Sequence, residues 1–302
     1  MAKREYILRH QKIIQKLRAG KPVPFEGLQD YLRDQTELHS LDLCISKRTF
    51  QRDINEIRSI YGIDIHYDIP GGGYYIDAAD TSDIQERILE SFDMITSLKM
   101  VHDVTRFIQF EKRRPQGTRH FFGLLHAIKN RFVIHLTHQA FYRDEPVVHI
   151  IEPWFLKEFR ERWYIIGREV KKDAVKTFGL DRIQDFTITK KRFTYPEGYN
   201  PDALFKDCFG IFNPMGSKPA DIVLLFDPEQ GKYIKTFPLH ESQHILTDNN
   251  KEFRIRLHLH ITYDLIMELL SYGEKVEVIK PKSLRKDLVK IYQNAIKNNS
   301  AP

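Results

Sequence analysis

Residues 46–62 read SKRTFQRDINEIRSIYG. The apolar residues Phe50, Ile54, Ile57 and Tyr61 recur at steps of three and four, which predicts an amphipathic helix with one buried face. Ser46 precedes the helix and is suited to cap its first turn, and Gly62 follows it and is suited to end it in a left-handed conformation.

The opposite face of this predicted helix is rich in hydrogen-bond donors that reach phosphate oxygens and base edges. Asp53 and Glu56 fall elsewhere on the helical wheel, which predicts concentrated positive charge. The free amides of the first turn add affinity for anions. The residues expected to contact DNA on this helix are Ser46, Lys47, Arg48, Thr49, Gln51, Arg52 and Asn55.

The surrounding sequence completes a recognisable arrangement. Helical periodicity covers 4–19 and resumes for about two turns from Phe25, and a long polar connection spans 33–44. After the third helix, residues 63–67 alternate apolar and polar, and Gly71-Gly72-Gly73 separates them from Tyr74-Tyr75-Ile76, which predicts a hairpin. Three helices and a hairpin in this order favour a winged helix-turn-helix that binds DNA over a solvated helix and an ordinary turn. Gly72, Gly73 and Tyr74 are the expected wing contacts.

Length and composition limit the number of domains and the classes of protein that the chain can belong to. The chain has 302 residues, 41% of them hydrophobic and 29% charged, which suits several ordinary globular domains. The net charge of +6 is too small to indicate a nucleic-acid partner by itself, so the position of the charge must decide. The sequence shows neither a bilayer-length apolar segment nor a signal peptide, and Cys44 and Cys208 follow no disulfide or zinc pattern, so we expect a cytoplasmic protein.

The rest of the chain predicts an α+β multidomain protein. Apolar residues at helical spacing over 84–101 predict a helical connector at 79–119, whose apolar stripe is either core or a dimer contact, and its basic end, 111–119, is a weak binding candidate. A helix at 121–130 and short strands at 132–138, 147–151, 162–166, 174–180 and 185–193 predict a small barrel or sandwich. From Asp221 the order strand, helix, strand, helix, strand, helix predicts a separate module. The expected boundaries are 1–78, 79–119, 120–196 and 197–302.

Several motifs resemble WYL-domain transcriptional regulators. The segment 45–54 is similar to their recognition helix, and Glu152-Pro153-Trp154-Phe155-Leu156-Lys157, Arg162-Trp163-Tyr164-Ile165 and Phe178-Gly179-Leu180-Asp181-Arg182-Ile183 are similar to their central domain. The segments Pro238-Leu239-His240, Leu269-Leu270-Ser271-Tyr272-Gly273 and Val276-Glu277-Val278-Ile279 look like the C-terminal WCX extension. The chain departs from the family where histidine replaces tyrosine in the strand 133–138, and where Lys176 and Gly179 stand near positions that carry arginine in relatives.

The resemblance implies an Sm-like five-stranded β-barrel that senses a nucleic acid fragment or nucleotide and modulates the binding of a homodimer to double-stranded DNA. An anionic ligand needs cationic and aromatic groups, and the expected ligand-binding residues are Arg182, His138, Tyr142, Trp163 and Tyr164. Trp163 and Tyr164 are equally consistent with a buried barrel strand. Arg182 needs an anionic partner, which the neighbouring Asp181 or Asp185 also offers.

Two other classes of function stay open. The chain could be an RNA- or protein-binding adaptor that uses the barrel without reading an operator. A metallohydrolase is suggested by the HExxH spacing of His240, Glu241 and His244, but the segment is too short for the helix that such a zinc site needs. We therefore expect no enzyme activity, no catalytic residues, no cofactor, no metal ion and no membrane partner.

Overall fold

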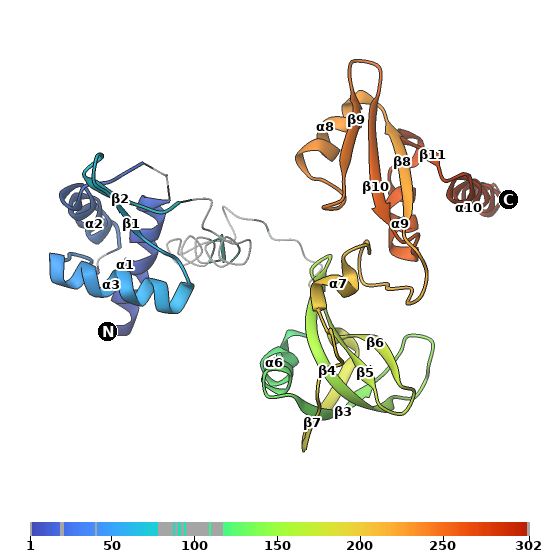
Figure 1. Cartoon of the computed structure of the whole chain (residues 1–302), viewed down its shortest axis with the longest axis horizontal. Coiled ribbons are helices and arrows are strands. Elements are labelled where there is room, and N and C mark those ends of the chain that lie inside the picture. Colours follow the sequence, from blue (N-terminus) through green and yellow to red (C-terminus); the bar gives the residue numbers. More distant parts are fainter. Residues whose placement is uncertain are drawn as a thin grey trace. The chain divides into compact units, whose positions relative to one another are not determined.

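The computed structural model describes residues 2–18, 21–39, 41–77 and 117–300, together with Arg87, Glu90, Ser91, Met94 and Gln109. The chain separates into two compact units, residues 1–111 and 112–302, and each is described by itself (Figure 1). The helical connector expected at 79–119, with its dimer contact, lies outside the described residues except for those five and 117–119.

The first unit consists of three helices followed by a small hairpin (Figure 1). The helices are α1 (Ala2–Leu17), α2 (Phe25–His39) and α3 (Lys47–Tyr61), and strands β1 (His66–Asp68) and β2 (Gly73–Tyr75) pair antiparallel. Val23, which precedes α2, adds a bridge to this hairpin, because its backbone exchanges two 2.8 Å hydrogen bonds with Tyr74. The hairpin is thereby attached to the helices rather than projecting freely.

The second helix is longer than its apolar spacing predicts. It continues through Arg33 to His39, so the polar stretch expected to be a long connection is mostly helix. Thr36 ties the following connection back to the last turns of α2. Its hydroxyl donates to the Leu32 carbonyl within the helix and accepts from the backbone N–H of Leu43 in the connection. The connection before α3 is therefore short, and the sequence prediction of a long one is wrong.

One core holds the first unit together, and every helix contributes to it. Its fully or almost fully buried members are Ile13, Ile14, Leu17, Leu28, Leu32, Leu43, Phe50 and Ile57. Ile65 and Ile76, on either side of the hairpin, are also buried in this core. The hydrophobic effect therefore fixes α3 by its inner face and leaves the outer face in solvent.

The second unit begins with helix α6 (Phe121–Lys129) and a five-stranded antiparallel sheet. Its strands are β3 (Phe132–His138), β4 (Val147–Phe159), β5 (Arg162–Glu169), β6 (Ala174–Gly179) and β7 (Ile183–Arg192). All five strands are predicted by the sequence, although β4 runs on past Ile151, through Pro153 and a break in the ladder, to Phe159. The order is β6-β5-β4-β3-β7, so the edge strands β6 and β7 are not paired with each other, and the expected closed barrel is not formed by strand pairing.

The last part of the chain combines helices with a four-stranded sheet of order β11-β8-β10-β9 (Figure 1). A short helix α7 (Pro201–Phe205) comes first. The elements that follow are β8 (Ala220–Phe226), α8 (Pro228–Thr236), β9 (His244–Asp248), β10 (Phe253–Leu259), α9 (Tyr263–Ser271), β11 (Val276–Lys280) and α10 (Lys282–Asn299). This order confirms the predicted alternation and adds β9, which the sequence analysis missed.

The HExxH segment, His240–His244, is not helical. His240 lies in a turn, where its Nδ1 accepts a 3.1 Å hydrogen bond from the backbone N–H of Ser242. His244 is the first residue of strand β9. The two imidazoles therefore lack the shared helical face on which that zinc motif depends.

Candidate functional site

Helix α3 is fixed at both ends by the residues that the sequence indicated. The Ser46 hydroxyl accepts a 3.1 Å hydrogen bond from the backbone N–H of Thr49, and the two side-chain hydroxyls lie 3.0 Å apart. At the other end Gly62 has φ 71°, and its N–H donates to the Arg58 carbonyl at 2.9 Å. Both predicted caps are confirmed, and the first turn has one defined conformation.

The outer face of α3 is solvent-exposed along its length. The exposed residues are Ser46, Lys47, Arg48, Gln51, Arg52 and Asn55, and Thr49 is half-buried. The inner face buries Phe50, Ile54 and Ile57. Within the part of the chain that the structure describes, no carboxylate pairs with Lys47 or Arg48, so their charges are available to a ligand. The Lys47 ammonium lies 5.8 Å from the centre of the Phe25 ring.

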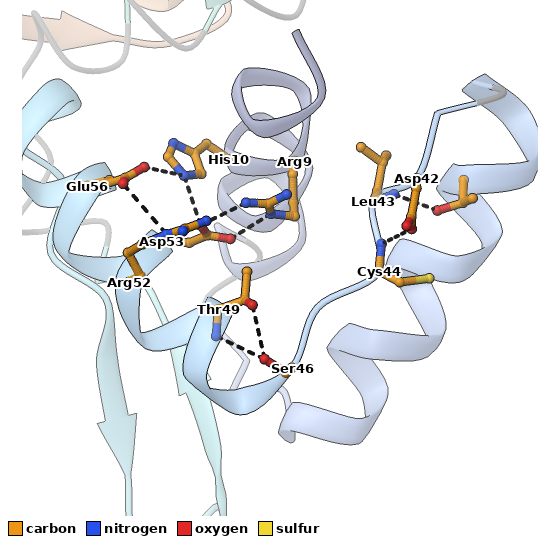
Figure 2. Close-up of polar contacts among 11 residues, drawn as sticks. Arg9, His10, Asp42, Leu43, Cys44, Ser46, Thr49, Arg52, Asp53 and Glu56 are labelled. Atoms are coloured by element: carbon orange, nitrogen blue, oxygen red, sulfur yellow. Dashed lines mark hydrogen bonds and ion pairs between the residues drawn. The ribbon is translucent and has the colours of Figure 1, made fainter. Parts of the chain in front are cut away.

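A buried ion pair joins α3 to α1 (Figure 2). Arg9 donates to both carboxylate oxygens of Asp53, at 2.6 and 2.9 Å, and both side chains are buried. Burial alone would raise the pKa of Asp53, but its neighbours His10 and Arg9 outweigh that effect and lower the pKa below its ordinary value. Asp53 is therefore an anionic anchor inside the unit.

The positive charge on α3 is less concentrated than the helical wheel predicts. Arg52 lies 3.7 Å from a Glu56 oxygen and 4.0 Å from an Asp53 oxygen (Figure 2). The expectation that these acidic residues point away from the donor face is wrong for Glu56, which is half-exposed one turn after Arg52. Lys47 and Arg48 thus carry the unopposed charge of the helix.

The three residues expected at the wing differ in their surroundings. Gly72, with φ 62°, is exposed at the tip of the hairpin. Gly73 is buried, and a Cβ there would lie 2.6 Å from the Val23 nitrogen. The Tyr74 ring packs edge-on against Phe50 at 4.8 Å and Tyr67 at 4.9 Å. Gly73 and Tyr74 therefore attach the hairpin to the core, and Gly72 is the freely accessible one.

The second unit contains a cationic pocket of about 390 Å³. It is lined by Arg119, Gln139, Ala140, Phe141, Arg143, Asp181, Arg182, Ile183 and Gln184. The Arg182 guanidinium lies 5.0 Å from the centre of the exposed Phe141 ring, and its Nε is 3.8 Å from an Asp181 oxygen and has no hydrogen-bond partner. Three arginines and one aspartate give this pocket a net positive charge.

Of the five residues that the sequence assigned to a ligand, Arg182 alone lines this pocket. Tyr142 is 85% exposed and lies beside Arg143, at 6.0 Å from ring centre to guanidinium. Trp163 is half-buried against Phe121, and Tyr164 is buried in the packing between the sheet and α7. Tyr164 is therefore a core residue, the alternative that the sequence left open, and Trp163 packs half-buried against the core.

His138 is buried and directly precedes the pocket residue Gln139 in the sequence. Burial, followed by the positive charge of Arg182 and the proximity of His149, lowers its pKa from 6.5 to about 4. The imidazole is therefore neutral near pH 7 and adds no positive charge to the site. Its Nε2 is buried without a hydrogen-bond partner.

Lys176, which stands near a position that carries arginine in relatives, is engaged internally. Its ammonium pairs with the buried carboxylate of Glu169, and His149 Nδ1 lies 2.7 Å from the other Glu169 oxygen. The contacts of these two basic side chains lower the pKa of Glu169 against the opposing effect of burial. The Lys176 charge is therefore neutralised by Glu169, and Lys176 does not line the pocket.

Sequence reasoning missed most of the pocket. Arg119 ends the basic segment 111–119, which carried only a weak signal, and Gln139, Phe141 and Arg143 belong to one loop after β3. Asp181 and Arg182, the other charged part of the lining, belong to the short 3-10 turn Leu180–Arg182. These segments are far apart in sequence, so only the folded sheet brings them together.

Comparison with protein families identifies two domains in the second unit. Residues 119–188 match the WYL domain, and residues 218–296 match the WCX domain. The chain therefore contains a WYL domain followed by a WCX domain. Its five-stranded sheet and pocket lie in the WYL domain, and its four-stranded sheet lies in the WCX domain.

Individual relatives align with different shares of the chain. Proteins named PafB from Mycobacterium tuberculosis and Mycobacterium bovis are 33% identical over 60 residues, which is 20% of this chain and 18% of their length. Among solved structures, proteasome accessory factor B/C (PafBC) of Arthrobacter aurescens aligns with 100% of this chain and 48% of its own, at 19% identity and a TM-score of 0.41. A CRISPR Cas-related protein aligns with 88% of this chain and 77% of its own, at 14% identity and a TM-score of 0.38. At these TM-scores, structural likeness assigns neither fold nor function.

No helix among the described residues combines the length and the apolar character that crossing a membrane demands.

Proposed function

We propose that this chain is a DNA-binding transcriptional regulator whose first unit is a winged helix-turn-helix and whose WYL domain senses an anionic ligand. The observation that carries the proposal is the outer face of α3, where Lys47, Arg48 and Gln51 are exposed on a helix held rigidly from behind. A helix with such a face fits the major groove, where its first turns meet base edges. The WYL and WCX domains and the resemblance to WYL-domain regulators support the same function.

The proposed DNA contacts follow from exposure. Lys47, Arg48, Gln51 and Asn55 read or position the duplex, and Ser46 and Thr49 contribute their side-chain hydroxyls at the first turn. Arg52 contributes once its side chain moves away from Glu56. Gly72 lets the hairpin tip approach a phosphate backbone closely, because it has no side chain. Gly73 and Tyr74 support that tip from below.

The ligand proposed for the pocket is a nucleic acid fragment or nucleotide. Arg119, Arg143 and Arg182 supply positive charge, and Phe141 and the adjacent Tyr142 offer exposed rings for stacking on a base. Ligand binding would bias the placement of two DNA-binding heads in a cytoplasmic homodimer, as a palindromic operator requires.

Arg48→Ala is expected to weaken operator binding by about 1–3 kcal/mol and to relax specificity at one base position. The reason is that Arg48 is exposed on the first turn and no carboxylate in the described part of the chain opposes its charge. A gel-shift titration against the operator measures the effect. Arg33→Ala is the matched control, because Arg33 is also exposed but pairs with Asp30 on α2; equal losses in both variants would refute the assignment.

Arg182→Ala is expected to weaken binding of a short single-stranded oligonucleotide by about 1.5–3 kcal/mol, the range for a hydrogen bond to a charged group. Its guanidinium lines the pocket, and its Nε makes no hydrogen bond to any of the described residues. Fluorescence anisotropy with a labelled oligonucleotide measures the affinity. Arg192→Ala on β7, whose guanidinium lies against Phe132 outside the pocket, serves as control. Unchanged affinity in Arg182→Ala would remove this residue from the site.

The competing function, an RNA- or protein-binding adaptor, makes a different prediction. Binding to duplex DNA through phosphates weakens steeply as salt increases, with a slope set by the number of phosphates neutralised. We expect that slope for duplex DNA to become shallower when Lys47 and Arg48 are both replaced by alanine. Tight binding of single-stranded RNA together with weak, variant-insensitive binding of duplex DNA would favour the adaptor.

A further inference from the structure

We propose that His10, Asp53 and Glu56 form a binding site for a divalent transition-metal ion of the Zn²⁺ class between α1 and α3. One nitrogen and two carboxylate oxygens, one from each residue, all lie within 4.8 Å of one another. Sequence reasoning gave no hint of this set, because His10 belongs to the apolar stripe of α1 and the two acidic residues belong to α3.

The two distances from His10 to the carboxylates suit an ion between these groups. His10 Nε2 is 3.4 Å from Asp53 Oδ1 and 3.6 Å from Glu56 Oε2 (Figure 2). Ligands about 2.1 Å from a tetrahedral ion lie about 3.4 Å from each other. His10 Nε2 therefore lies at a suitable distance from both oxygens, and the half-exposed Glu56 carboxylate is free to adjust its distance from the Asp53 oxygen, which lies within 4.8 Å of it.

His10 supplies the observation that points to a ligand. Its side chain is fully buried, and neither ring nitrogen makes a hydrogen bond of good geometry, so that Nε2 has only its 3.4 and 3.6 Å contacts with the two carboxylates. A buried polar group without a partner is costly, and coordination through Nε2 would remove that cost for the nitrogen that faces both carboxylates. The imidazole is held in place by the rings of Tyr6 and Tyr61, whose centres lie 5.1 and 6.2 Å from its own.

The neighbouring Arg9 limits which ions the site accepts. Arg9 donates to both oxygens of Asp53, and since a carboxylate oxygen has two lone pairs, Oδ1 keeps one for an ion. This bond also orients the carboxylate, as hydrogen bonds to metal ligands commonly do. The Arg9 charge disfavours ions that bind by charge alone, so the nitrogen-containing set selects Zn²⁺ over Mg²⁺ or Ca²⁺.

The outer side of the site is accessible. The Glu56 side chain is 40% exposed, and Arg52, which is 64% exposed, approaches it only at 3.7 Å. Arg52 can therefore move into solvent and leave Glu56 and a water molecule to complete the ion's coordination. A bound ion would join α1 to α3 and would hold the outer face of α3 in one orientation.

The test uses the full chain, freed of metal with a chelator and dialysed. Calorimetric titration with Zn²⁺ should show one strong site per chain, and Mg²⁺ at the same concentration should show none. Glu56→Gln should weaken Zn²⁺ binding at least tenfold while leaving the helical circular dichroism unchanged, because Glu56 is half-exposed. His10→Gln should abolish the visible absorption of bound Co²⁺.

Surface histidines that bind zinc adventitiously are controlled with His258→Gln, which breaks an exposed histidine–aspartate pair with Asp221. This variant should bind Zn²⁺ as the wild type does. Hydrogen exchange should slow in α1 and α3 when Zn²⁺ is added to the wild type but not when it is added to Glu56→Gln. Absence of a strong Zn²⁺ site, equal binding by the wild type and Glu56→Gln, or loss of binding only in His258→Gln would overturn the proposal.

Discussion

Asp53→Asn is expected to destabilise the first unit by about 3–5 kcal/mol, the cost of leaving one member of a buried ion pair without its partner. Arg9 is buried and directs both of its hydrogen bonds to the Asp53 carboxylate, so the substitution leaves an unpaired guanidinium in the core. Because the pair joins α1 to α3, the loss should appear in both helices.

Hydrogen exchange followed by mass spectrometry measures this loss locally in the full chain. We expect protection in α1 and α3 to fall roughly a hundredfold or more, since each 1.4 kcal/mol is about tenfold. Asp64→Asn is the matched control, because Asp64 pairs with Arg58 at the surface, where such a pair is worth about 0–1 kcal/mol. Similar protection in the two variants would mean that the Arg9–Asp53 pair does not anchor α3.

The WYL domain is expected to lose about 2 kcal/mol of stability between pH 7 and pH 5 through His138 alone. Its pKa is lowered from 6.5 to about 4 in the folded state, mainly by burial. The unfolded chain therefore binds the proton first as the pH falls below 6.5, and stability decreases until the folded pKa is reached. At pH 7 His138 is neutral in the folded chain and mostly neutral in the unfolded chain, so it then has little effect on stability.

Urea unfolding measures this effect in the right domain, because both tryptophans of the chain, Trp154 and Trp163, lie in WYL strands and report its unfolding by fluorescence. His138→Leu should lack this part of the pH dependence, whereas His126→Gln, which changes an exposed histidine on α6, should retain it. An identical pH dependence in His138→Leu and the wild type would show that His138 does not titrate with the proposed shift.

Local signals made α3 predictable almost residue by residue. The Ser46 cap, the Gly62 end and the buried face depend on neighbours within a few positions, and all are confirmed. The Arg9–Asp53 pair was beyond sequence reasoning, because its members are 44 residues apart and only tertiary packing turns Asp53 inward. The second half of α2 was not predicted for a different local reason. It is polar and carries too few apolar residues to show helical periodicity.

The pocket was even harder to predict, because it also depends on residues that are far apart in the sequence. Alternating residues predicted all five strands of the WYL sheet, but the pocket is built from the ends and loops between them. Arg182 was found because a cationic residue at a strand end draws attention, whereas Phe141 and Arg143 sit in a loop without a pattern. Of the conspicuous aromatic pair, Tyr164 is buried in the packing of the domain and Trp163 lies half-buried against it, so neither lines the pocket.

The central claim is that the outer face of α3 reads a DNA sequence. Sequencing the DNA retained by the full chain from a library of random duplexes, with the wild type and Arg48→Ala in parallel, tests it most directly. The wild type should enrich one shared motif, Arg48→Ala should lose information at one position of that motif, and a short single-stranded oligonucleotide should change the amount recovered. Retention without any enriched motif, or the same motif at the same strength in both proteins, would contradict the claim.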